Sequence, residues 1–124
     1  MACFIKCIVV VFSASITIEA VSAETMLSKP DQKAAKNIFL VSSAALHCDN
    51  FILNREKMRS YALENGVATD RLALERGPYQ SARDYALQVT NAHITLGGTA
   101  GLCAAVVADF GPSGALAKGL VTAR

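Results

Sequence analysis

The chain has 124 residues, 52% of them hydrophobic, with 12 Lys and Arg against 10 Asp and Glu. This length suffices for one domain with a modest core and is too short for two. A net charge of +2 without a dense basic face excludes the electrostatic footprint of a nucleic-acid-binding protein.

The N-terminal segment has the layout of a secretory signal peptide. Lys6 precedes an apolar run over residues 7–18, and small residues end at Ala23, immediately before Glu24. The run is about half as long as a membrane-spanning helix. We therefore expect cleavage between Ala23 and Glu24, which removes residues 1–23. The remaining residues 24–124 are expected to form a single domain in the periplasm or outside the cell. An uncleaved anchor is the alternative.

Cleavage there would remove two of the four cysteines and leave Cys48 and Cys103. An even pair in an exported domain indicates one disulfide, because oxidising compartments join such thiols. Closing a loop of this length restricts the unfolded chain by about 4 kcal/mol in the chain-entropy description. We therefore predict that Cys48 and Cys103 form a disulfide that stabilises the domain.

Helices are predicted along the mature chain from end to end. Ser28 is suited to cap the first helix, and Pro30 fits its first turn because the N–H that proline lacks would be unpaired there. The apolar stripe of this helix recurs at spacings of four and three and consists of Ala34, Ile38, Val41, Ala45, Cys48 and Ile52. The stripe predicts one long first helix with Cys48 on its inner face.

A second helix is predicted over residues 55–65. Asn54 is suited to cap its start, and Gly66 is suited to end it in the left-handed conformation. Val67 would then fold back onto Ala62, as in a Schellman ending.

Glycine and proline separate the later helices. Thr69 opens a short helix that ends before Gly77 and Pro78. The next helix has the clearest stripe, formed by Tyr79, Ala82, Ala86, Val89, His93 and Leu96. Two glycines at 97–98 interrupt it, and Gly111 ends the helix that follows. The stripe of that helix consists of Thr99, Cys103, Val106 and Phe110.

Residues 113–124 are expected to add one short packed helix. No alternation of apolar and polar residues is long enough to predict a strand. Both cysteines of the mature chain lie on inward stripes, so their disulfide is expected to join the two ends of the domain. The sequence therefore predicts an all-α fold, a small bundle of four to five helices cross-linked by one disulfide.

Candidate catalytic or metal-binding groups are few. His47 adjoins Cys48, but a nucleophilic cysteine must be free and accessible, and this one has an oxidation partner. Zinc sites are typically marked by paired ligands at short spacing, which His47 and His93 do not provide. We assign no catalytic, cofactor-binding or metal residue. An enzyme or metal protein that uses both histidines in one cleft stays as an alternative.

Residues 85–108 contain no Asp, Glu, Lys or Arg. Such a segment is found in membrane-active secreted polypeptides, which is a second alternative. Gln88, Asn91 and the two glycines dilute its apolar character, so a buried helix and no stable membrane span after signal cleavage are expected.

Tyr61, Tyr79 and Tyr85 lie near arginines in the sequence, and Tyr and Arg are favoured at binding hot spots. We expect a small exported helical protein with a non-catalytic binding or envelope-associated role. The expected partner is another protein of unknown identity, and neither nucleic acid nor a cofactor is expected.

Overall fold

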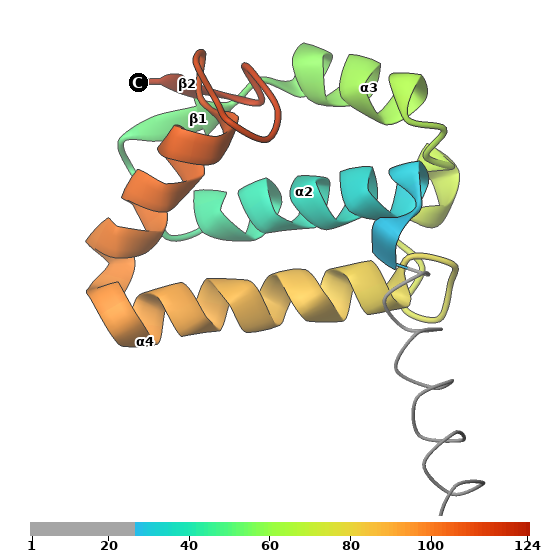
Figure 1. The fold of residues 1–124 in the computed structure, drawn as a ribbon, viewed down its shortest axis with the longest axis horizontal. Helices are drawn as coiled ribbons and strands as arrows, with labels where there is room; N and C mark the ends of the chain where they lie inside the picture. Colours follow the sequence, from blue (N-terminus) through green and yellow to red (C-terminus); the bar gives the residue numbers. More distant parts are fainter. Residues whose placement is uncertain (1–26) are drawn as a thin grey trace, which may run out of the picture.

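The computed structural model describes residues 27–124, so the predicted signal peptide and its cleavage between Ala23 and Glu24 lie outside the described residues. The elements are, in order, α2 (Pro30–Ala45), β1 (Phe51–Leu53), α3 (Arg55–Glu64), a 3₁₀ turn (Thr69–Arg71), α4 (Gln80–Phe110) and β2 (Val121–Ala123). Figure 1 shows α2 between α3 and the N-terminal half of α4, and α2 packs most extensively against α4.

The prediction of an all-α bundle of four to five helices is wrong. Residues 27–124 form three α-helices, and β1 pairs with β2 in an antiparallel two-stranded sheet. Phe51 lies opposite Ala123, and Leu53 lies opposite Val121. Strands of three residues are too short to show an alternating pattern, and each depends on hydrogen bonds to a partner far away in the chain. Residues 113–124 accordingly form a loop and β2, and the helix predicted there is absent.

The first helix is shorter than predicted, because α2 ends at Ala45. Cys48 lies just after the turn that ends α2, and Ile52 belongs to β1 with its side chain exposed. The apolar residues continue at helical spacing beyond the end of α2, so the spacing alone does not reveal where the helix stops. Pairing of β1 with β2 and the position of Cys103 determine the backbone of this segment.

Local signals at the ends of α3 are confirmed. The Lys57 backbone N–H donates to Asn54 Oδ1 at 3.1 Å, so Asn54 caps the helix. Gly66 has a φ of 72°, and the Val67 N–H donates to the Ala62 carbonyl at 2.9 Å, which is the hydrogen bond of a Schellman ending. The start of α2 differs from the prediction, because its N-cap is Lys29 and not Ser28.

The break predicted at the two glycines is present inside α4. Gly98 has φ 68° and ψ −176°, a conformation essentially restricted to glycine, and it divides α4 into an N-terminal arm (80–97) and a C-terminal arm (99–110). Figure 1 shows the two arms meeting at a sharp bend. The predicted stripe of the N-terminal arm is buried at Ala82 and Ala86, but Leu96 is 89% exposed.

The buried side chains form two clusters. The disulfide core consists of Val41, Ala44, Cys48, Phe51, Leu102, Cys103, Val106, Phe110, Leu120 and Val121. The alanine core consists of Ala34, Ala35, Ile38, Ala62, Val67, Tyr79 and Ala82. Both lie against α2, the first towards its C-terminal end and the second towards its N-terminal end.

Candidate functional site

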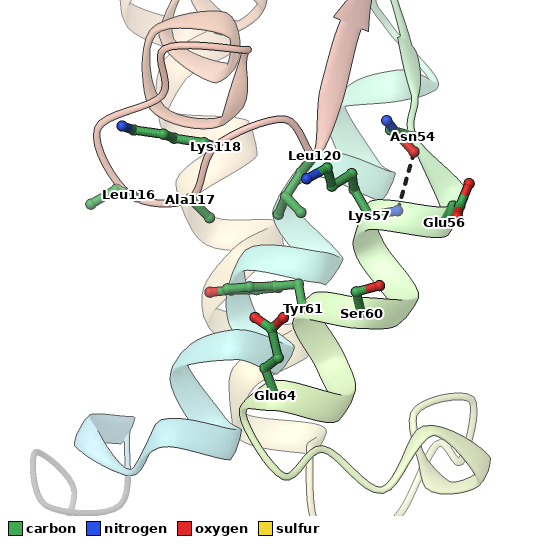
Figure 2. Close-up of a pocket in the computed structure, with 10 residues that line it drawn as sticks. All are labelled: Asn54, Glu56, Lys57, Ser60, Tyr61, Glu64, Leu116, Ala117, Lys118 and Leu120. Carbon is green, nitrogen blue, oxygen red and sulfur yellow. Dashed lines mark hydrogen bonds between the residues drawn. The ribbon is translucent and has the colours of Figure 1, made fainter.

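A hollow of about 520 Å³ opens between α3 and the loop that precedes β2. Figure 2 shows α3 on one side of it and the loop residues 116–118 on the other. Its lining consists of Asn54, Glu56, Lys57, Ser60, Tyr61, Glu64, Leu116, Ala117, Lys118 and Leu120. On α3, Lys57, Tyr61 and Glu64 recur at spacings of four and three, so one face of this helix supplies the wall.

Two smaller hollows share residues with the first. The second, of about 390 Å³, is lined by Ser28, Pro30, Lys33, Lys36, Asn37, Tyr61, Asn65 and Leu116. The third, of about 160 Å³, is lined by Lys36, Asn37, Leu40, Tyr85, Ala86, Val89, His93, Asp109 and Leu116. Because Leu116 borders all three, we refer to them together as the central groove.

Backbone hydrogen bonds hold the loop that carries Leu116 over the end of α4. The N–H groups of Leu116 and Ala117 donate to the Asp109 carbonyl at 3.0 and 3.1 Å. A Cβ on Gly114 would lie 2.5 Å from the same carbonyl oxygen, so only glycine allows the loop to approach this closely. The loop therefore presents Leu116, which is 61% exposed, in a defined position.

A hydrogen bond between α2 and α3 joins two of the residues that line the groove. The buried Asn37 Nδ2 donates to Tyr61 Oη at 2.9 Å, and Asn65 Nδ2 donates to the Tyr61 carbonyl at 2.8 Å. Accepting from Asn37 leaves the hydroxyl proton of Tyr61 for another acceptor. The Tyr61 hydroxyl can therefore donate to a group bound in the groove.

The charges of the groove are unevenly distributed. The first hollow combines Lys57 and Lys118 with two glutamates, and the third combines Lys36 with Asp109. The second contains Lys33 and Lys36 and no carboxylate among its lining residues. The Lys36 ammonium lies 5.1 Å from the centroid of the Tyr85 ring, a cation–π contact at the boundary with the third hollow.

Both histidines are exposed. His93 lines the third hollow together with Asp109, whereas His47 is not among the lining residues of that hollow. Residues 27–124 contain no group of three or more His, Cys, Asp or Glu side chains placed to hold a metal ion.

The structure contains the predicted disulfide between Cys48 and Cys103, whose Cα atoms are 5.6 Å apart. Both residues are buried in the disulfide core. The bond joins the turn after α2 to the C-terminal arm of α4, so in this form Cys48 has no thiol to act as a nucleophile. Cys103 lies on a helix as predicted, but Cys48 lies after the end of α2 and not on the stripe of the first helix.

The uncharged segment 85–108 lies within α4, which is long and apolar enough to cross a membrane by length and composition. Of the most apolar stretch of α4, 22% is buried. Leu96 near the bend and Leu46 after α2 are 89% and 84% exposed.

The three tyrosines have different positions. Tyr79 is a core residue, because its hydroxyl accepts from the Ala68 N–H at 2.8 Å and donates to Asp31 Oδ2 at 3.4 Å. Tyr61 and Tyr85 line the central groove.

The sequence does not mark Leu116 as a groove residue, because its loop is positioned by contacts with α4 and by no local motif.

The lysines of the groove were missed as well, although one signal was present. Lys29, Lys33 and Lys36 recur at spacings of four and three on the polar face of the first helix. Such a row is ordinarily a solvated face, and only the position of Tyr61 and Leu116 turns part of it into the wall of a hollow.

Comparison of the chain with protein-family models, with curated proteins and with solved structures finds no match.

Proposed function

We propose that this chain is an exported, non-catalytic binding protein that holds a segment of a partner polypeptide in the central groove. The main support for the proposal is the position of Leu116. This exposed leucine borders all three hollows, and backbone hydrogen bonds hold its loop in place. An exposed apolar side chain on a backbone that is already held in place suits polypeptide binding, because little backbone entropy is lost on association.

Two features favour binding over catalysis. Cys48 is joined to Cys103 and therefore has no thiol to act as a nucleophile. His47 and His93 are both exposed, and only His93 lines the third hollow. A convergent pair of histidines, on which the enzymatic alternative depends, has no support in that hollow.

Export is part of the proposal. It is supported by the layout of residues 1–23 and by the buried disulfide, since structural disulfides persist in oxidising compartments. Intact mass measurement of the secreted protein, before and after reduction and alkylation, tests it. We expect a chain that begins at Glu24 with two thiols that react only after reduction. A full-length mass would contradict processing.

The binding proposal is tested by selecting peptides from a displayed random library on the oxidised protein. We expect the Leu116→Arg variant to bind the selected peptides at least about ten-fold more weakly than the wild type. The matched control is Leu63→Arg, because Leu63 is 67% exposed on α3 and lies outside the groove. Failure to select any peptide, or equal loss in both variants, would contradict the proposal.

A second candidate is a membrane-active polypeptide that uses residues 85–108, and the nearly full exposure of Leu46 and Leu96 favours it. Co-sedimentation with vesicles of phosphatidylcholine and phosphatidylglycerol tests it. Binding that is lost in the double variant Leu46→Ser/Leu96→Ser would support it, and absence of binding by the wild type would exclude it.

A further inference from the structure

The second hollow of the central groove has the chemistry of a site for a negatively charged group. Lys33 and Lys36 lie one turn apart on α2 and both line it, and no carboxylate does among the described residues. The nearest acid on the same helix turn, Asp31, does not line the hollow and accepts a hydrogen bond from Tyr79 instead.

Neutral groups complete the lining. Asn37 donates to the Tyr61 hydroxyl oxygen, so the proton of this hydroxyl is left for another acceptor. A carboxylate in the hollow could accept this proton while the two ammonium groups balance its charge. Pro30 and Leu116 add apolar surface at its edge.

The shape of the groove distinguishes a polypeptide from a small anion. The second hollow shares Tyr61 and Leu116 with the first, and Lys36, Asn37 and Leu116 with the third. A free anion would use the lysines alone, whereas an extended chain can also cover Leu116. Nucleic acid fits poorly, because it carries a phosphate at every nucleotide and Glu56, Glu64 and Asp109 line the adjoining hollows. A polypeptide can place one carboxylate in the second hollow and uncharged residues beside it.

We propose that the second hollow binds an acidic segment of the partner polypeptide, with a carboxylate between Lys33 and Lys36 and a neighbouring apolar side chain on Leu116. This inference rests on the proposed function and adds the chemical class of the ligand. The lysines supply charge selectivity and on-rate, and Leu116 supplies contact area that is independent of charge.

Two fluorescein-labelled peptides test the inference by fluorescence anisotropy. The acidic probe alternates Glu and Leu in a Gly and Ser background, and the neutral probe has Gln in place of every Glu. We expect the oxidised protein to bind the acidic probe about ten-fold more tightly, and added salt to reduce this difference. The double variant Lys33→Gln/Lys36→Gln is expected to lose the preference and to bind both probes like the neutral one.

The matched control is Arg71→Gln/Arg76→Gln, which removes the same charge from exposed residues that line none of the three hollows. It is expected to keep the preference, and equal loss in both double variants would overturn the inference by revealing a response to net charge alone. Circular dichroism melting checks that both variants fold.

The remaining outcomes separate this inference from the proposed function. Equal, Leu116-dependent binding of both probes would overturn the acidic ligand and leave the polypeptide-binding groove intact. Binding of neither probe, together with failure of the library selection, would overturn both. Inorganic phosphate that protects Lys33 and Lys36 from amine labelling, in a protein that binds neither probe, would replace the inference with a small-anion site.

Discussion

The disulfide core and the alanine core hold the same helices together by different means. The disulfide core contains large apolar side chains, including Phe110, Leu102 and Leu120, with the Cys48–Cys103 bond among them. The alanine core has four alanines, which let α2, α3 and α4 approach closely. Burial of large apolar side chains supplies more stabilisation for each residue than burial of alanine.

Polar groups compensate on the side of the alanine core. Gln32 Nε2 donates to the Pro78 carbonyl at 2.8 Å, and the Tyr79 hydroxyl bonds to the chain at Ala68. Arg83 donates to the carbonyls of Leu72 and Leu74. These bonds fix the long connection between α3 and α4, where few apolar side chains are buried. Side-chain hydrogen bonds thus stabilise this end of the domain, whereas the disulfide and large apolar side chains stabilise the other.

α4 connects the two regions, because its N-terminal arm supplies Ala82 to one core and its C-terminal arm supplies Leu102 to the other. The bend at Gly98 allows this division. Whether the two cores unfold together or separately therefore depends on this bend.

Leu102→Asp is expected to unfold the domain. Leu102 is fully buried in the disulfide core, and an unpaired carboxylate there costs roughly 4 kcal/mol or more. Ala104→Asp, at an exposed position on the same arm, is the matched control and should change stability little. Thermal melting by circular dichroism measures both. A cooperative transition of Leu102→Asp near the wild-type midpoint would contradict the position of this helix face.

Cys48→Ala is expected to lower the free energy of unfolding by about 2–4 kcal/mol under oxidising conditions. The loss arises because the unfolded chain is no longer closed by the bond to Cys103. With reductant present the wild type loses the same constraint, so the two proteins should melt alike. Urea denaturation in both conditions measures the difference, and equal stability of the two proteins without reductant would exclude the disulfide.

Gly98→Ala is expected to destabilise the domain by about 1–3 kcal/mol, because alanine does not readily adopt the backbone conformation of Gly98. A Cβ at this position would meet no atom within 4 Å, so the cost is conformational and not steric crowding by a neighbour. Gly97→Ala is the matched control on the adjacent helical residue and should be stabilising by about 0.5–1 kcal/mol. Equal effects of the two substitutions on thermal melting would argue against a bend confined to Gly98.

Tyr79→Phe is expected to destabilise the domain by about 1 kcal/mol, because it leaves the Ala68 N–H without its acceptor. Amide hydrogen exchange should become faster in the connection between α3 and α4 and remain unchanged around Cys103. Uniformly faster exchange would show that the two cores open as one unit.

Local signals in the sequence identified several ends of helices. Asn54, Gly66 and Gly98 each act within a few residues, so their effect on the backbone is independent of the rest of the fold. The end of α2 at Ala45 and the sheet were not predictable in this way. Each depends on contacts between residues 55 or more positions apart, such as the bond of Cys48 to Cys103 and the pairing of Phe51 with Ala123.

The candidate site was predictable only in fragments. Tyr61 and Tyr85 were identified as possible contact residues and line the groove, whereas Tyr79 is buried although its residue type and neighbours are similar. Burial of a tyrosine is decided by which element packs against it. Lys33 and Lys36 belong to no motif in the sequence, and they line a hollow because the loop with Leu116 lies beside them.

Local sequence patterns were sufficient to predict the helical character of most of the chain, the cap of α3, the bend of α4 and the pairing of two cysteines. The first three depend on short-range backbone preferences, and the last on the number of cysteines, because two cysteines allow only one intramolecular pairing. The tertiary structure decided the sheet, the end of α2 and the central groove. These features need segments distant in sequence to meet, and the energy that joins them comes from long-range hydrogen bonds and burial, which leave little trace in local patterns.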